Sequence, residues 1–331
     1  MSNTNVQPLI SLIVVNYNGL PFLKKLLGSM LSQTYSQCEI ICVDCGSTDR
    51  SVEYIQSHAP TVRIVTCKNR GFGYGANRGA EKARGTYCMF FNSDMYIPRT
   101  FVAHMYKRFM IDQSKFGSKL VLGCKIIPFA TQPKDTEPYY GGTFDLLGFP
   151  TNAKNHNETL MINGNPFFIN RKQFLRAKGF NELIFLYGED ADLSWRLYLL
   201  GYTLRIDNTT WIAHYGSASV GKELSARKMS YVLFGTFLPL IMNYGTGMYV
   251  GILFFYIPFF IALNITLLIY SRFNFAYNRA LWNMYMVVFR RWNYATQLRT
   301  WVQENRQRSE WEVLHKLRII PSVLVNGLRR R

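Results

Sequence analysis

The chain has 331 residues, of which 48% are hydrophobic and 15% aromatic, so it can bury a large core in one or two domains. This composition excludes a disordered or collagen-like protein. The net charge of +18 is unevenly placed, because residues 221–331 hold 15 Lys and Arg against 4 Asp and Glu. Such a basic excess is typical of proteins that bind a polyanion, whether nucleic acid, an anionic membrane surface or a phosphate-bearing substrate.

Residues 9–125 alternate between strand-like apolar runs and amphipathic or glycine-rich segments. The strand-like runs cover 9–15, 38–43, 62–67 and 87–91, and the intervening segments cover 21–33, 48–58, 71–85 and 98–110. Repeated βα units of this kind predict an α/β fold with a mostly parallel, doubly wound sheet and flanking helices.

The segment 126–160 is rich in Pro, Gly, Asn and Thr and predicts a long loop or short hairpin over the functional site. Beyond it we expect a strand over 160–169 and helices over 171–178 and 190–200. Two further short strands are expected over 202–206 and 210–213.

Polar residues stand where three of the predicted strands end. They are Asn16-Tyr17-Asn18, Asp44 to Asp49, and Asn92-Ser93-Asp94. In an open parallel sheet the ligand crevice lies at the carboxyl ends of the strands. The pattern therefore predicts a nucleotide site at this edge of the sheet.

Met229–Ser271 is a stretch of 43 residues without a charged residue or a histidine, and basic residues flank it at both ends. This is a membrane signal, and it favours an anionic membrane surface over nucleic acid as the partner. Gly245-Thr246-Gly247 divides the stretch, so we expect an apolar hairpin or re-entrant pair. The alternative is a buried helical pair in the interface of a homo-oligomer.

Residues 272–331 mix cations with tryptophans, which predicts basic interfacial helices. We therefore divide the chain into an α/β domain over 1–220 and a helical, membrane-associated region over 221–331. The polar start of the chain is no export signal, so disulfides among the six cysteines are not expected, and Cys42 reads as a core residue. The expected location is the cytoplasmic face of a membrane.

The first 215 or so residues resemble an inverting family 2 glycosyltransferase with the GT-A fold. The motifs that carry the resemblance occur in order, and the acidic segment followed by a histidine is most similar to bacterial rhamnosyltransferase-type members. They are Val15 to Asn18, Val43 to Asp49, Asn69 to Gly79, Asn92 to Asp94, Glu189 to Arg196, and His214.

The resemblance implies a site for a nucleotide-diphosphate sugar. Tyr17 would stack on the base and Asp44 would accept from a pyrimidine N–H, although a packing aromatic and a turn residue are the structural alternatives. Asp94 and His214 would bind Mn²⁺ or Mg²⁺, which neutralises the departing diphosphate. The other expected donor contacts are Val15, Asn69, Gly73, Asn77, Arg78 and Ser93.

The resemblance also implies that Asp190 is the base that takes the acceptor proton, with Glu189 orienting it or holding the acceptor. Asp192, Trp195 and Arg196 are expected on the acceptor side. The spacing of Asp192 and Arg196 also suits a structural ion pair on one helix face.

These expectations describe a metal-dependent inverting glycosyltransferase that uses a dTDP- or UDP-sugar, with rhamnose the leading candidate. The basic C-terminal third suggests a lipid-linked glycan acceptor. Two alternatives are an inactive membrane scaffold of the same fold and, less favoured, a nucleic-acid-binding protein. The scaffold alternative arises because Asn92 and Ser93 replace acids of the usual metal motif.

Overall fold

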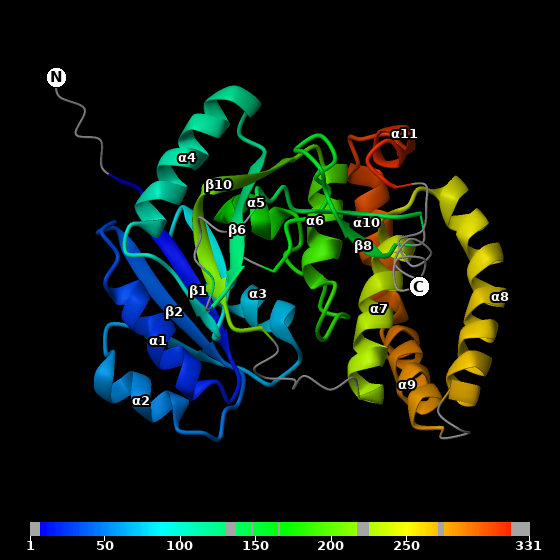
Figure 1. Cartoon of the computed structure of the whole chain (residues 1–331), viewed down its shortest axis with the longest axis horizontal. Coiled ribbons are helices and arrows are strands. Elements are labelled where there is room, and N and C mark those ends of the chain that lie inside the picture. The colour runs from blue at the N-terminus through cyan, green and yellow to red at the C-terminus, as the bar shows by residue number, and fades with distance from the viewer. Residues whose placement is uncertain are drawn as a thin grey trace.

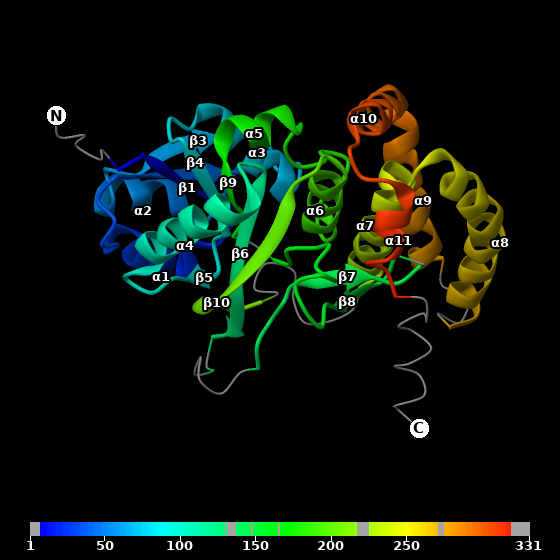
Figure 2. The same cartoon turned by 90° about the horizontal axis from the view of Figure 1, so that it is seen from above.

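The structure of the chain is a computed structural model that describes residues 7–129, 131, 137–146, 148–164, 166–216, 225–270 and 275–318. An α/β region forms one half of the molecule and a group of helices forms the other (Figure 1). The two halves meet along α6 and α7, which lie side by side in both views (Figure 2).

The strands of the main sheet are β1 (Ile10–Asn16), β2 (Cys38–Asp44), β3 (Arg63–Thr66), β4 (Tyr87–Asn92), β5 (Met95–Tyr96), β6 (Leu120–Pro128), β9 (Phe168–Asn170) and β10 (Thr203–His214). Their order in space is β3-β2-β1-β4-β9-β6-β10-β5. Strands β1 to β4 pair in parallel, as do β6 and β10, whereas β9 and β5 pair antiparallel with their neighbours. The expected mostly parallel α/β sheet is therefore confirmed.

Alternation along the strands places apolar side chains on both faces of this sheet. On β1, Leu12 and Val14 pack with α1 (Leu20–Leu31), α2 (Ser51–His58) and α4 (Phe101–Phe116). Ile13 points the other way, toward α3 (Phe72–Lys82), α5 (Arg171–Arg176) and α6 (Glu189–Leu199). Helices thus cover both faces, which explains why the strand sequences are almost continuously apolar.

The prediction of a strand over 160–169 is wrong for most of that range, because only its end, in β9, pairs with the main sheet. Instead, the Ile162 N–H donates to the Ser194 hydroxyl at 3.0 Å and the Gly164 N–H donates to the Asp190 carboxylate at 2.7 Å. Helix α6 therefore satisfies backbone groups that a sheet neighbour would otherwise satisfy. The expected hairpin is present as β7 (Gly142–Phe144) and β8 (Pro150–Asn152).

The remaining helices are α7 (Ala226–Asn243), α8 (Thr246–Tyr270), α9 (Ala276–Arg290), α10 (Trp292–Asn305) and α11 (Glu310–Leu314). Helix α7 packs among α6, α9 and α10 and buries most of its apolar side chains there. Helix α8 stands at the edge of the molecule (Figure 1) and exposes 78% of Phe254 and 64% of Ile269. Within the described parts of the chain, no helix combines the length and hydropathy needed to cross a bilayer.

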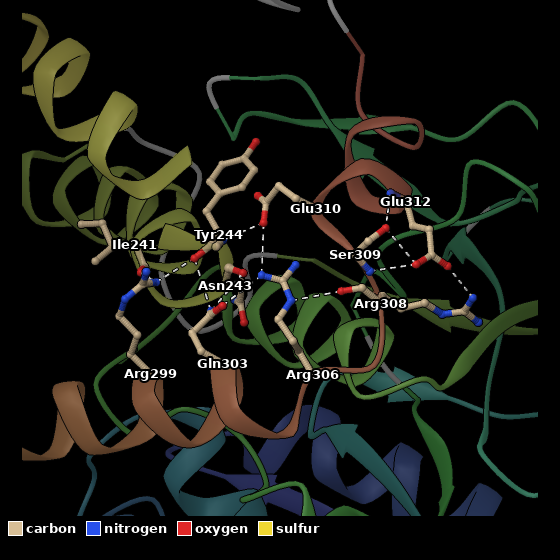
Figure 3. Close-up of polar contacts among 11 residues, drawn as sticks. Ile241, Asn243, Tyr244, Arg299, Gln303, Arg306, Arg308, Ser309, Glu310 and Glu312 are labelled. Carbon is tan, nitrogen blue, oxygen red and sulfur yellow. Dashed lines mark hydrogen bonds and ion pairs between the residues drawn. The ribbon is translucent and has the colours of Figure 1, made fainter. Parts of the chain in front are cut away.

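Helix α10 binds the carboxyl end of α7 through polar side chains (Figure 3). The Arg299 guanidinium donates to the carbonyls of Ile241 and Tyr244, the latter at 2.9 Å. Gln303 donates to the Asn243 and Tyr244 carbonyls at 3.4 and 3.3 Å. A cation and an amide thus satisfy the last carbonyls of a helix, where its dipole is negative.

Candidate active site

A cavity of about 480 Å³ opens at the carboxyl ends of β1 and β4, where the sequence predicted a ligand crevice. We call it the donor cavity, after the ligand that the sequence analysis expects it to bind. Its lining from the α/β region includes Val15, Tyr17, Cys45, Asn69, Gly71, Asn92, Ser93, Asp94, Phe185, Leu186, Tyr187 and His214. Five predicted donor-site residues and His214 therefore come together at one cavity: Val15, Tyr17, Asn69, Ser93 and Asp94.

Tyr17 is 46% exposed at the cavity wall, as a residue that stacks on a ligand ring would be. Asp44, the last residue of β2, is 2% exposed and does not line the cavity. Its carboxylate accepts hydrogen bonds from Asn16 at 3.1 Å and from the N–H groups of Gly46 and Ser47 at 3.1 and 2.9 Å. Asp44 therefore shapes the loop after β2, and its contact with a base stays a prediction.

Asp94 and His214 meet although 120 residues separate them in the sequence. Nε2 of His214 lies 3.1 Å from Oδ1 of Asp94, because the antiparallel pairing of β10 with β5 sets His214 opposite Met95. The N–H of Tyr215 also donates to the Asp94 carbonyl at 3.0 Å. This pairing fixes an acidic oxygen and an imidazole nitrogen side by side at the cavity.

The donor set suits a divalent cation, since a carboxylate oxygen and an imidazole nitrogen are ligands that Mn²⁺ accepts. Among the described residues there is no group of three or more His, Cys, Asp and Glu side chains that could enclose an ion. Two protein ligands leave positions for water and substrate phosphate, which is how Mg²⁺ is commonly held.

The segment from Phe185 to Tyr187 forms one wall of the donor cavity and is held between two helices. On one side, the Phe72 N–H at the start of α3 donates to the Phe185 carbonyl at 3.2 Å. On the other side, a Cβ added to Gly235 of α7 would lie 1.8 Å from the Tyr187 carbonyl oxygen. Tyr187 itself has a φ of 64°, a left-handed conformation that costs energy for a residue with a side chain.

Glu189 and Asp190 begin α6 directly after this segment and beside the donor cavity, although neither lines it. Asp190 accepts from the N–H groups of Gly164 and Ala191 at 2.7 and 2.8 Å. Burial raises the pKa of Asp190, although these two N–H donors oppose the rise. Burial and the neighbouring Asp190 charge raise the pKa of Glu189 to about 8.

One oxygen of Glu189, Oε2, is buried without a hydrogen-bond partner among the described residues. Asp190 is thus held in a fixed orientation by the backbone, whereas Glu189 retains an unused acceptor. Two adjacent carboxyls with raised pKa values beside a cavity are typical of acid–base sites.

Helix α7 and its N-cap residue also line the donor cavity, through Ser225, Arg227, Lys228 and Tyr231, none of which was predicted from the sequence. Tyr231 stacks on Phe185 with ring centroids 5.0 Å apart. Arg227 donates to the Tyr231 hydroxyl at 2.8 Å. No local pattern marks these residues, and only the cations before the apolar stretch could have indicated them.

Three expected donor contacts lie away from the donor cavity. Gly73 packs against Phe180, where an added Cβ would meet the Phe180 side chain at 2.8 Å. Asn77 is 7% exposed and bonds both the N–H and the carbonyl of Phe180, at 2.8 and 2.9 Å. Arg78 pairs with Glu182 at 3.1 Å. These three residues therefore hold the chain before Phe185 against α3, and their contact with a donor stays a prediction.

The three expected acceptor-side residues are buried, since Asp192, Trp195 and Arg196 are at most 1% exposed, and their role toward an acceptor stays a prediction. Arg196 pairs with Asp192 at 2.9 Å and donates to the Ala177 and Gly179 carbonyls. Asn243 of α7 donates to the second Asp192 oxygen at 3.2 Å. The structural ion pair that the spacing suggested is therefore confirmed, and it ties α6 to α5 and α7.

A mixed α/β sheet with its cavity at the strand ends and an Asp–His pair on the cavity wall fits the GT-A class of glycosyltransferase folds. The profile of the family described as Glycosyl transferase family 2 matches residues 11–176, about half of the chain, and the chain belongs to this family.

Two relatives agree with this membership. The chain is 33% identical over 135 residues to the uncharacterized glycosyltransferase EpsJ of Bacillus subtilis, covering 40% of this chain and 37% of EpsJ. It is 39% identical over 94 residues to an uncharacterized glycosyltransferase of Haemophilus influenzae, covering 27% of this chain and 38% of that protein. The matches thus span less than two fifths of either relative.

A solved structure of GalNAc-T7 with UDP, GalNAc and Mn²⁺ has a similar fold. Its TM-score is 0.58 at 16% sequence identity, over 72% of this chain and 48% of that one. At this identity the likeness concerns the fold alone.

Proposed function

We propose that this protein is a metal-dependent, inverting glycosyltransferase that moves a sugar from a nucleotide-diphosphate donor to a hydroxyl group of an acceptor. The observation that carries the proposal is the meeting of Asp94 and His214 on a cavity at the strand ends of a family 2 fold. That GalNAc-T7 is solved with UDP and Mn²⁺ supports a similar donor and ion here.

Asp94 and His214 would hold the divalent cation, which supplies Lewis-acid neutralisation of the leaving diphosphate. Tyr17 would stack on the base at the exposed rim of the donor cavity. Val15, Asn69 and Ser93 line the same cavity and would orient the donor. A dTDP- or UDP-sugar suits the proposed base contact of Asp44, and rhamnose is the sugar we would test first.

Asp190 would accept the proton of the attacking hydroxyl, since the N–H groups of Gly164 and Ala191 hold its carboxylate in place. The raised pKa of Asp190 lies nearer to neutral pH than that of an ordinary carboxyl, so the carboxylate is a stronger base for the acceptor proton. The unpartnered oxygen of Glu189 would accept a hydrogen bond from the acceptor. The acceptor would therefore approach between the start of α6 and the donor cavity.

We further propose that the acceptor is a lipid-linked glycan and that the C-terminal helices associate with the cytoplasmic face of a membrane. Exposed apolar side chains on α8 and α9 support this, among them Phe254, Ile261 and Trp282. A test is cosedimentation with anionic vesicles, in which Phe254→Ser with Ile261→Ser should reduce binding severalfold. Unchanged binding by this double variant would contradict the membrane assignment.

The catalytic test is donor cleavage in detergent with Mn²⁺ across dTDP-, UDP- and GDP-sugars. Wild type should cleave one donor class, and Asp94→Ala and Asp190→Asn should abolish turnover. If Asp190→Asn cleaves the donor as fast as wild type, the assignment of Asp190 as the base is wrong. If wild type cleaves no donor, the result supports the alternative of an inactive scaffold of this fold.

A further inference from the structure

A second cavity, which we call the arginine cavity, adjoins the donor cavity between the N-terminal ends of α7 and α9. Its volume is about 660 Å³, and it shares the side chains of Arg227 and Tyr231 with the donor cavity. Arg279 of α9 also lines the arginine cavity. A ligand can therefore extend from the donor cavity past Arg227 to Arg279 without crossing the protein interior.

A third cavity of about 630 Å³, the apolar groove, continues from the arginine cavity between α8 and α9. Phe275 and Arg279 line both. The groove adds Ile261, Ile265 and Trp282, whose side chains are 58%, 54% and 63% exposed. The donor cavity, two arginines and an apolar groove thus follow one another along the surface.

Positive charge along the arginine cavity and the apolar groove is not matched by negative charge. Arg227 uses its Nε for the Tyr231 hydroxyl at 2.8 Å, and Arg279 makes no side-chain hydrogen bond or ion pair within the described parts of the chain. Among the described residues that line the arginine cavity and the apolar groove, none is acidic. Two guanidinium groups in one cavity without an acid are suited to bind phosphate oxygens.

We infer that the arginine cavity binds the phosphate of a prenyl-phosphate-type acceptor lipid, whose apolar chain lies in the apolar groove. The inference rests on the proposed function, because it places the acceptor's sugar end toward the donor cavity. The order of the cavities favours a lipid phosphate over free phosphate, since a free ion would leave the apolar groove unexplained.

The arrangement also links the lipid site to the chemistry. Arg227 contacts Tyr231, and Tyr231 stacks on Phe185 of the donor-cavity wall at 5.0 Å. An anion bound at Arg227 would therefore be linked, through Tyr231 and Phe185, to the segment that leads into Glu189. A membrane-bound lipid would reach this point along α8 and α9, whose exposed apolar residues face outward.

The experiment measures binding of geranylgeranyl phosphate to the full-length protein in nonionic detergent by titration calorimetry. Arg279→Gln should weaken binding about tenfold or more, as expected for the loss of a charged hydrogen bond to phosphate. The matched control is Arg290→Gln, which removes the same charge from the exposed end of the same helix, outside all three cavities. The control should bind within about twofold of wild type.

Two further ligands test the contributions of the arginines and of the apolar groove separately. Geranylgeraniol, which lacks the phosphate, and inorganic phosphate, which lacks the chain, should each compete weakly. Equal losses in Arg279→Gln and Arg290→Gln would overturn the site in favour of diffuse charge attraction. Competition by inorganic phosphate as strong as that of the lipid would overturn the role of the apolar groove.

Donor cleavage by wild type keeps the two proposals distinguishable. If wild type cleaves a donor but Arg279→Gln binds the lipid phosphate normally, the lipid site is wrong and the enzyme assignment stands. If the lipid phosphate binds as expected but no donor is cleaved, the lipid site stands and the enzyme assignment fails.

Discussion

Gly235 of α7 lies against the backbone of Tyr187, so close that a Cβ on Gly235 would come within 1.8 Å of the Tyr187 carbonyl oxygen. Gly188 meets the same helix from the other side, where an added Cβ would be 2.2 Å from the Gly235 carbonyl oxygen. Two glycines thus allow a C-terminal helix to contact the turn that leads into Glu189 and Asp190. Helix α7 is therefore part of the candidate active site.

Gly235→Ala should displace the 185–188 segment, because backbone atoms meet the new methyl group and no side chain can rotate away. We expect a loss of about 1 to 3 kcal/mol of stability and a larger loss of donor cleavage. The control is Gly28→Ala on α1, where an added Cβ meets nothing within 4 Å and which should be neutral or slightly stabilising. Thermal unfolding of both variants is the measurement, and equal melting temperatures would contradict the contact.

Asp94→Asn and His214→Asn should each weaken Mn²⁺ binding by at least about tenfold and reduce donor cleavage at least as much. A matched control exists in the pair of His104 with Asp207, whose Nε2 and Oδ2 are 3.0 Å apart outside the donor cavity. His104→Asn should leave Mn²⁺ affinity unchanged. Calorimetric titration with Mn²⁺ tests this without turnover, and equal affinity of all variants would remove the metal assignment.

The raised pKa of Glu189 predicts how stability depends on pH. Between its ordinary pKa of 4.5 and the folded value of about 8, the folded protein binds more protons than the unfolded chain. Stability from this group is therefore greatest below pH 4.5 and falls as the pH rises toward 8. Glu189→Gln should raise the melting temperature at about pH 8.5 more than at about pH 5.

Glu312 provides the opposite case for that measurement. Its hydrogen bond with Arg308 and the capping of α11 lower its pKa to about 2, so its carboxylate stabilises the fold above pH 4.5 and loses this effect as the pH falls. Glu312→Gln should therefore lower the melting temperature slightly at neutral pH. If Glu189→Gln and Glu312→Gln changed the melting temperature in the same direction, the raised pKa of Glu189 would be refuted.

Asp192→Ala should be among the more destabilising single changes in the chain, because it leaves the Arg196 guanidinium buried without its carboxylate. Removing one partner of a buried pair costs about 3 to 5 kcal/mol. The control is Glu312→Ala in the exposed Arg308–Glu312 pair, which has the same i,i+4 spacing and should cost within about 1 kcal/mol. Urea unfolding at neutral pH compares the two, and equal costs would contradict the structural role of Asp192.

Much of the sheet was predictable, because apolar runs and the polar residues that end them are local signals. The ends of β1 and β4 do border a cavity, and Tyr17 and Ser93 line it as expected. The roles of Asn77 and Arg78 were not predictable, since a polar residue in a glycine-rich helix looks the same whether it faces a ligand or the Phe180 backbone.

The C-terminal third was harder to interpret for a physical reason. A helix buried in protein and a helix that meets lipid both need apolar residues at helical spacing, so the sequences of α7 and α8 show the same pattern. The structure separates them, because α6, α9 and α10 cover α7, whereas Phe254 and Ile265 of α8 remain exposed.

The α/β class, the family and the order of the strand-end motifs could be inferred from the amino-acid sequence, because these depend on short-range patterns of polar and apolar residues. Which side chains share the cavity is settled by tertiary packing. The contacts of His214 with Asp94 and of Gly235 with Tyr187 join distant segments. Such contacts form when a sheet and helices pack as a whole, and no local periodicity encodes them.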